Sequence, residues 1–261
     1  MSTPHPARAL TGMIETLARR GDHRPDEWLR FLTMDVLAGF GERLETPWDE
    51  RRHTALFELS GLYGRLVAEN PWRDILGAVY MELSAHGQRK WMGQYFTPQS
   101  VADFMAEIST GDLDPSAHPK DRFVTILEPT SGAGILLLSV CNSVATTHGA
   151  EALRRLSLTA IDLDPLCARM TACQLLANAA LHGPLGEILV YRGNALGNPA
   201  DLEVVTHRLA PPRCVAGRPE PIPEVLPALA PQRLAAVMSA TESCQLSLFD
   251  DATLPPLQRT A

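Results

Sequence analysis

One stretch of the sequence indicates the fold most clearly: Phe123-Val-Thr-Ile-Leu-Glu128-Pro-Thr-Ser-Gly132-Ala-Gly134. A short apolar run rich in β-branched residues is followed at once by a turn with two glycines. Apolar residues then continue in Ile135-Leu-Leu-Leu-Ser-Val. This order predicts a buried strand, a tight turn and a helix. The two glycines allow the backbone to turn tightly and to approach a ligand closely, because no Cβ intervenes.

The same order of elements occurs twice more along the chain. Leu158-Thr-Ala-Ile is followed by Asp162-Leu-Asp-Pro and by a helix from Pro165 to about Leu181, and Ile188-Leu-Val-Tyr leads to Gly193-Asn-Ala-Leu. Short buried strands that alternate with helices predict parallel strands joined by right-handed crossovers, hence a doubly wound α/β sheet. Ligands of such sheets bind at the carboxyl ends of the strands, where each of these turns lies.

Two acidic residues narrow the class of ligand. Glu128 opens the glycine turn, where a carboxylate would repel a phosphate but suits an ammonium or hydroxyl group. Asp162 ends the second strand, where a carboxylate can accept hydrogen bonds from both hydroxyls of a ribose. Together they indicate a nucleoside-type cofactor with a cationic amino-acid part, which favours S-adenosylmethionine over NAD or ATP. The alternative is that Gly-x-Gly forms a purely structural turn.

Residues 1–92 are predicted to be a helical region. Apolar residues at helical spacing follow Pro25-Asp26, a second helical segment runs from after Pro47 to Glu69, and a third is expected to start at Asn70-Pro71 as an N-cap and first-turn proline. These apolar stripes are interpreted as core.

Composition and charge set limits on the function classes. The chain has 261 residues, 45% of them hydrophobic and 20% charged, which is ordinary for a globular protein. The net charge of −7 argues against a surface that attracts nucleic acid as a whole. The five cysteines form no Cys-x-x-Cys pair, so no metal site or disulfide framework is expected. With neither a membrane span nor a secretory signal in sight, a cytoplasmic location is expected.

The segment before the glycine turn carries a family resemblance. Gly93-Gln-Tyr-Phe-Thr-Pro98 resembles the Gly-Gln-aromatic-aromatic-Thr-Pro signature of the modification subunits of type I restriction systems and related adenine-N6 DNA methyltransferases. The glycine turn and the acidic turn Ile161-Asp-Leu-Asp-Pro165 follow in the order found in that family. The resemblance covers about residues 70–200. It implies a partial Rossmann-like methyltransferase sheet after the helical region, adenine-N6 methylation of DNA, and S-adenosylmethionine as cofactor.

The resemblance also assigns roles to individual residues. Tyr95, Phe96, Thr97 and Pro98 would hold the methionine end of the cofactor, and Glu128, Pro129, Gly132 and Gly134 would form the floor near its amino group. Asp162 would bind the ribose hydroxyls, and Leu163 would pack on the adenine. Asn194 stands where the family usually has Asp, so its contact with the adenine amino group would lack charge.

The catalytic element of the family is Asn or Asp, Pro-Pro and an aromatic residue at the end of the fourth strand, and this sequence lacks it. In the family its polar groups accept hydrogen bonds from the target adenine and the ring stacks on the flipped base. The nearest positional match is Ala210-Pro211-Pro212, whose alanine has no side-chain acceptor. Two hypotheses follow: an adenine-N6 DNA methyltransferase of the restriction-modification type, or a catalytically impaired cofactor-binding module. A further methyltransferase or specificity subunit could supply the missing part.

A domain boundary is predicted near residue 210, so that residues 93–210 form the truncated methyltransferase-like domain and 211–261 a flexible, proline-rich linker and tail. Eight prolines lie between residues 199 and 231, where each removes a backbone donor. The tail contains Gln245-Leu246-Ser-Leu248-Phe249, which resembles the peptide by which bacterial proteins bind the DNA polymerase sliding clamp. Alternatively, the match arises by chance or these apolar residues fold back onto the sheet edge.

Overall fold

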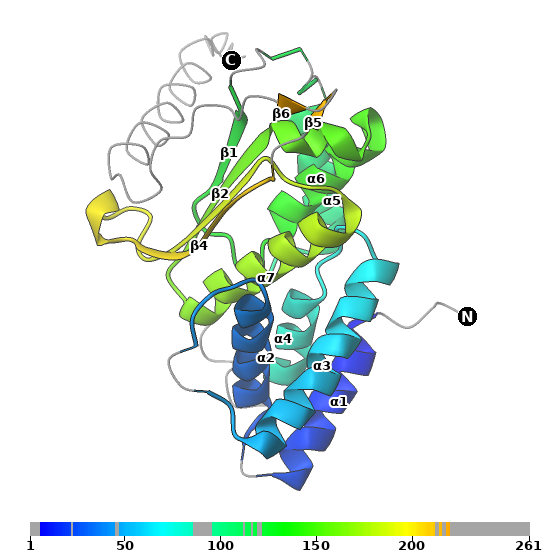
Figure 1. Ribbon diagram of the computed structural model, residues 1–261, viewed down its shortest axis with the longest axis vertical. Coiled ribbons are helices and arrows are strands. Elements are labelled where there is room, and N and C mark those ends of the chain that lie inside the picture. Colours follow the sequence, from blue (N-terminus) through cyan, green and yellow to red (C-terminus); the bar gives the residue numbers. More distant parts are fainter. Residues whose placement is uncertain are drawn as a thin grey trace, which may run out of the picture.

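The computed structural model describes residues 6–21, 23–44, 47–85, 96–111, 113–115, 117–118, 122–211, 214–215 and 218–219. It shows an α/β protein in which N-terminal helices lie against the helical face of a four-stranded sheet (Figure 1). The predicted fold class is confirmed by this arrangement.

The sheet has the strand order β1-β2-β3-β4. Strands β1 (Val124–Glu128), β2 (Leu156–Asp162) and β3 (Glu187–Arg192) run parallel, as the sequence predicts. Strand β4 (Glu203–Leu209) pairs with β3 and runs antiparallel to it. Within the expected linker, β5 (Cys214–Val215) and β6 (Arg218–Pro219) form a short antiparallel pair.

Helices α6 (Ile135–His148) and α7 (Pro165–His182) make the two crossovers between the parallel strands. Because consecutive right-handed crossovers in one direction place their helices on one face of the sheet, α6 and α7 share a face. The predicted doubly wound arrangement, which needs helices on both faces, is therefore wrong for these two crossovers. Helix α7 packs on β2 and β3, and α5 (Gln99–Thr110) packs along α6. Two short 3-10 helices, η2 (Ala150–Arg155) and η3 (Pro199–Asp201), precede β2 and β4.

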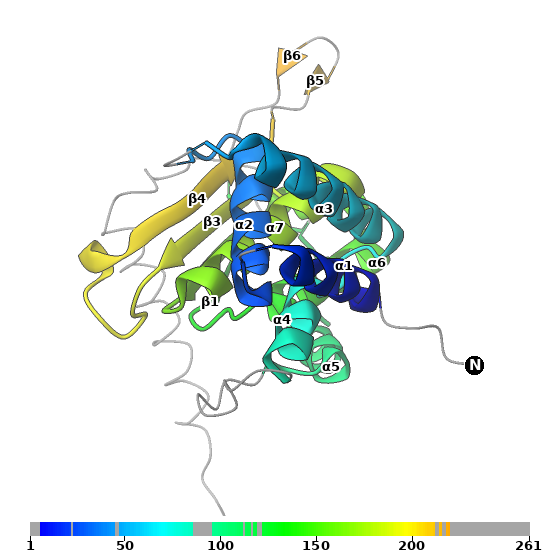
Figure 2. The ribbon, with the colours of Figure 1, turned by 90° about the horizontal axis from the view of Figure 1, so that it is seen from below.

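The N-terminal region consists of α1 (Ala7–Arg20), α2 (Pro25–Gly39), α3 (Glu50–Glu69) and α4 (Leu76–Ala85). Helices α2, α3 and α4 contact α7, so this region packs on the helical layer of the sheet (Figure 2). One hydrophobic cluster extends from Leu10 and Leu59 in the helical region to Leu138 and Leu175 in the sheet region. The two predicted regions therefore share one core.

The start of α4 differs from the prediction. Asn70 ends α3, because its Nδ2 donates a hydrogen bond to the Leu66 carbonyl at 2.8 Å. Trp72 then adopts a left-handed conformation with φ of 56°, which redirects the chain. The α4 helix begins only at Leu76, and Asp74 Oδ1 accepts a hydrogen bond from the Gly77 N–H at 2.7 Å. The predicted helix start at Asn70-Pro71 is therefore wrong.

No helix in the described part of the chain is long and apolar enough to span a membrane.

Candidate cofactor site

The carboxyl ends of β1, β2 and β3 lie at one edge of the sheet, because the three strands are parallel. The turn Pro129–Gly134, the turn after Asp162 and the loop from Gly193 all leave the sheet at this edge. The sheet therefore brings together three segments that lie far apart in the sequence. We call this edge the cofactor edge.

The glycine turn has a backbone conformation that other residues rarely adopt. Gly132 has φ of +57° and Gly134 has φ of +91°. A Cβ at Gly134 would lie 3.1 Å from Thr171 Cγ2. The turn is closed by a hydrogen bond from the Gly134 N–H to the Ser131 carbonyl at 2.7 Å, and the Ser131 N–H donates to the Ile161 carbonyl of β2 at 2.9 Å. Both glycines are thus needed for the turn itself.

Asp162 joins the acidic turn to the glycine turn. Its Oδ2 accepts a hydrogen bond from the Gly132 N–H at 2.7 Å, and its Oδ1 accepts one from the Asp164 N–H at 2.8 Å. Each carboxylate oxygen has a second lone pair that can accept a hydroxyl proton. Burial raises the pKa of the Asp162 carboxyl, and the two backbone hydrogen bonds oppose this shift. A half-buried carboxylate with free acceptor capacity fits the two hydroxyls of a ribose.

Phe96 lies against the glycine turn. A Cβ on Gly132 would meet its ring at 3.3 Å, so the absence of a side chain there lets the ring approach the backbone. The ring of Tyr80 in α4 packs on the Phe96 ring, and the two ring centroids are 5.1 Å apart. Thr97 is half-buried and Pro98 is exposed beside them. The structure therefore brings the described end of the predicted signature to the turn, whereas Tyr95 lies outside the described residues.

The remaining predicted cofactor residues also lie at the cofactor edge. Leu163 directly follows Asp162 and is 71% exposed. Its side chain thus offers an apolar surface on which an adenine base can pack. Glu128 accepts hydrogen bonds from the Thr130 N–H and hydroxyl at 3.2 and 3.3 Å, and Pro129 is exposed. Asn194 Oδ1 accepts a hydrogen bond from the Leu196 N–H at 3.0 Å. Its oxygen therefore closes a local turn, which leaves one lone pair for a ligand.

Ala210, the first residue of the catalytic candidate Ala210-Pro211-Pro212, lies at the opposite edge of the sheet. Because β4 is antiparallel, its carboxyl end meets the amino end of β3, and the Ala210 N–H donates to the Gly186 carbonyl at 3.0 Å. Pro211 is exposed there, its carbonyl accepting a hydrogen bond from Arg154, and Pro212 is outside the described residues. Ala210 therefore lies away from Asp162 and Gly132, which are at the cofactor edge.

Two polar residues of α7 that the sequence analysis did not single out also reach the glycine turn. Thr171 Oγ1 donates to the Gly132 carbonyl at 3.0 Å, and Gln174 Nε2 donates to the Ala133 carbonyl at 2.7 Å. Both side chains are fully buried. The available signal was their spacing, since they stand three residues apart on a helix that is otherwise mostly apolar.

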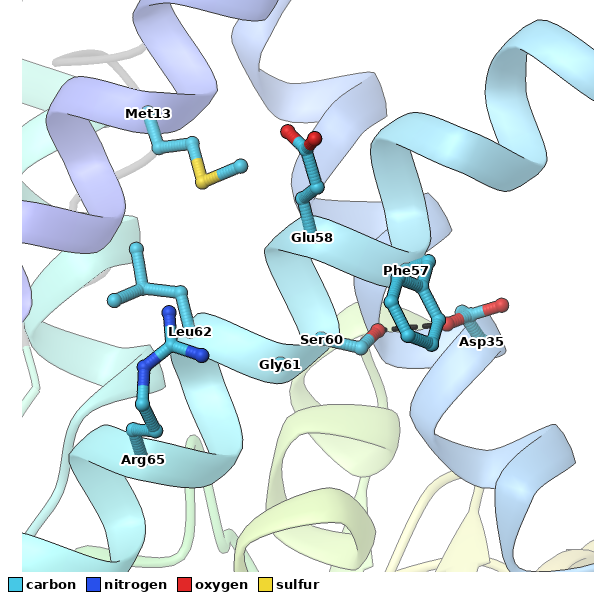
Figure 3. A pocket seen from close by; sticks show the side chains of 8 residues that line it. All are labelled: Met13, Asp35, Phe57, Glu58, Ser60, Gly61, Leu62 and Arg65. Carbon is cyan, nitrogen blue, oxygen red and sulfur yellow. Dashed lines mark hydrogen bonds between the residues drawn. The ribbon is translucent and has the colours of Figure 1, made fainter.

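A hollow lies on the N-terminal region, away from the cofactor-site residues, and is formed by α1, α2 and α3 (Figure 3). Asp35 at its side accepts hydrogen bonds from Ser60 Oγ at 2.6 Å and Trp48 Nε1 at 3.0 Å. These contacts tie α2 to α3 and to the loop between them. No predicted site residue lines this hollow.

Residues 72–207, more than half of the chain, match the model of the N-6 DNA Methylase family. The chain belongs to this family. S-adenosylmethionine is the cofactor that this membership implies, and the cofactor edge fits it, since the half-buried Asp162 carboxylate retains acceptor capacity beside the glycine turn.

Among solved structures, the chain is similar to one described as a class I S-adenosylmethionine-dependent methyltransferase from Listeria monocytogenes. The two share 16% sequence identity with a TM-score of 0.47, over 74% of this chain and 55% of the other. This chain thus spans little more than half the length of that protein. No curated protein sequence matches the chain.

Proposed function

We propose that this N-6 DNA methylase family member binds S-adenosylmethionine at the cofactor edge and acts in the methylation of adenine N6 in DNA, as in restriction-modification systems. One observation carries the proposal: the Asp162 carboxylate accepts the Gly132 N–H at 2.7 Å. This contact unites the two elements that the family uses for the cofactor, the acidic turn and the glycine turn.

Each residue of the cofactor edge contacts a different part of the cofactor in this proposal. Asp162 accepts hydrogen bonds from the ribose hydroxyls, and Leu163 offers its exposed side chain to the adenine. Gly132 and Gly134 give the turn its left-handed backbone conformation, against which the methionine part would lie beside Phe96. Glu128 supplies negative charge for the ammonium group. When bound, S-adenosylmethionine supplies an electrophilic methyl group on its sulfonium.

The first segment of the edge completes the proposed site. Phe96 lies on the turn and, with Tyr95, Thr97 and Pro98, would enclose the methionine end. Asn194 would contribute its remaining lone pair to the adenine amino group. An uncharged acceptor gives a weaker hydrogen bond than the usual Asp.

A second candidate function is a cofactor-binding module that does not transfer the methyl group by itself. The specific observation in its favour is the place of Ala210, at the edge opposite to Asp162 and Gly132. No segment of the sequence reads Asn or Asp followed by Pro-Pro. A second methyltransferase or specificity subunit would then supply the groups that bind the target adenine.

The test separates binding from transfer in the purified chain. Calorimetry with S-adenosylmethionine is expected to show binding that Asp162→Ala weakens by about ten-fold or more, the loss expected for a pair of hydrogen bonds to a charged group. Asp201→Ala is the control, since Asp201 is an exposed carboxylate of η3. Absence of binding by the wild-type chain would contradict the proposal.

Transfer is measured with a methyl-labelled cofactor and unmethylated DNA. Label in adenine N6 supports the enzyme, and cofactor binding without label supports the accessory module. Addition of a candidate partner subunit that restores the label would show where the missing groups reside.

The tail gives a separate partner proposal, on Gln245, Leu246, Leu248 and Phe249, which lie outside the described residues. We infer that a bacterial sliding clamp binds this peptide through the two last apolar side chains. A 241–255 peptide is expected to bind a purified clamp, and Leu248→Ala with Phe249→Ala is expected to abolish binding. Equal affinity of the two peptides would refute this proposal.

A further inference from the structure

We infer that Thr171 and Gln174 of α7 are positioning residues of the cofactor turn, which hold its peptide groups in the orientation that binds S-adenosylmethionine. The inference rests on the proposed cofactor function and extends it to a layer of residues behind the turn. Neither residue belongs to the predicted site, and both are fully buried.

Both side chains contact the backbone of the glycine turn directly. Thr171 and Gln174 donate to two successive carbonyls, those of Gly132 and Ala133, at 3.0 and 2.7 Å. In a planar trans peptide the carbonyl and the following N–H point in opposite directions. Because the Gly132 carbonyl points toward α7, the N–H of Ala133 points away from it. A donor fixed in this way is preorganised for an anionic or polar group of a ligand.

All hydrogen-bonding groups of the Gln174 side chain have partners. Its Nε2 donates to Asp74 Oδ1 at 2.8 Å as well as to the Ala133 carbonyl, and its Oε1 accepts from the N–H groups of Ile75 and Leu76 at 2.8 and 3.1 Å. An amide side chain has two donor protons and two acceptor lone pairs, so all four are used. Buried networks that are fully satisfied are rigid.

The hydrogen bonds of Gln174 connect the glycine turn to the N-terminal region. Asp74 and Ile75 lead into α4, whose Tyr80 packs on Phe96, and Phe96 lies against Gly132. The turn is therefore held from α7 and also from the segment that starts at Asp74. The N-terminal region thus contributes to the shape of the cofactor site through Gln174.

The test uses Thr171, because loss of four hydrogen bonds at Gln174 would impair folding. Thr171→Val keeps the shape and removes the donor to Gly132, and Thr171→Ser keeps the donor. Thr33→Val is the matched control, since Thr33 is equally buried and its hydroxyl donates to the Arg30 carbonyl within α2. Thermal unfolding of each full-length variant reports stability, and calorimetry with S-adenosylmethionine reports affinity.

We expect Thr171→Val to weaken cofactor affinity about ten-fold, because it removes the buried hydroxyl that contacts the Gly132 carbonyl and Ser131 Oγ of the turn. Thr171→Ser is expected to bind like the wild type, and so is Thr33→Val even if it loses as much stability. Equal affinity of Thr171→Val and the wild type would overturn the inference, as would an equal loss in Thr33→Val. Absence of binding by the wild type would instead remove the proposed function and this inference with it.

A second pair of variants tests Gln174 on the same helix. Asn178 is a buried amide that accepts from the Trp72 N–H at 2.6 Å and donates to the Gln174 carbonyl, without reaching the turn. In the fraction that remains folded, Gln174→Ala is expected to lower affinity more than Asn178→Ala. The same affinity in both would overturn the role of Gln174 beyond folding.

Discussion

At the scale of single residues, the glycine turn depends on backbone conformation more than on side-chain chemistry. Gly134 has φ of +91°, and a Cβ there would lie 3.1 Å from Thr171. Gly134→Ala is therefore expected to cost about 1 to 3 kcal/mol of unfolding free energy, from strain and from displacement of Thr171. Urea unfolding measures this cost.

Gly64→Ala provides the matched control for this substitution. Gly64 lies inside α3, and a Cβ there would meet nothing within 4 Å. The alanine is expected to stabilise the protein by about 0.5 to 1 kcal/mol, because glycine is the poorer helix former. A destabilisation of the same size in both variants would contradict the argument from conformation.

Asp162 gives a prediction about pH at the same scale. Burial raises the pKa of its carboxyl above the ordinary value, so the carboxylate is protonated earlier on acidification. A protonated carboxyl is a weaker acceptor for ribose hydroxyls. Affinity for S-adenosylmethionine is therefore expected to fall as the pH decreases through this raised pKa, and calorimetry over an acidic pH series measures it. Asp162→Ala should have low affinity with a flatter profile; an identical slope in both would contradict the role.

The same shift sets the sign of this residue's effect on stability. With the folded-state pKa above that of the unfolded chain, the folded state binds the proton more tightly. Its contribution therefore favours folding at pH values below the unfolded pKa and is lost as the pH rises through the folded pKa. Ionisation of the half-buried Asp162 is thus less favourable in the folded state than in the unfolded chain.

At the scale of elements, the antiparallel direction of strand β4 places its amino end, and not its carboxyl end, at the cofactor edge. It is fixed against β3 by backbone pairing and by His207, whose Nε2 lies 2.9 Å from Glu187 Oε1. The Glu187 side chain is fully buried and also accepts from Ser157 Oγ. A buried carboxylate requires such partners, so this pair stabilises the antiparallel arrangement.

Removal of the histidine tests the importance of this pair. His207→Leu is expected to lower the unfolding free energy by about 2 to 4 kcal/mol, because it removes one hydrogen-bond partner of the buried Glu187 carboxyl. His148→Leu is the control, since His148 lies 3.9 Å from a half-exposed Asp114 side chain, and a change below about 1 kcal/mol is expected. Chemical denaturation measures both, and equal changes would argue against a special role of Glu187.

At the scale of the whole molecule, the helical region and the sheet share one hydrophobic core. One apolar cluster includes Leu10 and Leu59 as well as Leu138 and Leu175, and Gln174 bonds both regions. We therefore expect a single unfolding transition. All four tryptophans lie within residues 1–92, so their fluorescence follows the helical region while far-ultraviolet circular dichroism follows all helices and strands. Two separate midpoints would contradict a shared core.

Much of the fold was predictable, because it depends on local patterns. Three parallel strands, the glycine turn and α7 agree with the predictions within a few residues. The start of α4 was mistaken, since Asn70 caps the end of α3 and Trp72 reverses the chain in a conformation that sequence patterns do not favour. The helix α1 was not singled out, although Leu10 and Ile14 have helical spacing and are buried.

The candidate site was predictable to the extent that its residues follow strands. Glu128, Asp162 and Asn194 each end or follow a parallel strand, and parallel strands necessarily gather their carboxyl ends at one edge. The supporting residues were not, because Thr171 and Gln174 look like ordinary helix positions until α7 packs behind the turn.

By itself, the sequence determined the class of fold, the family and the cofactor edge, because hydrophobic periodicity and glycine turns act over short distances along the chain. Only the tertiary structure decided the direction of β4, which separates Ala210 from Asp162, and the shared core of the two regions. Strand direction and packing depend on contacts between residues far apart in the chain, such as Glu187 with His207 and Asp74 with Gln174. Such contacts leave no local pattern in the sequence.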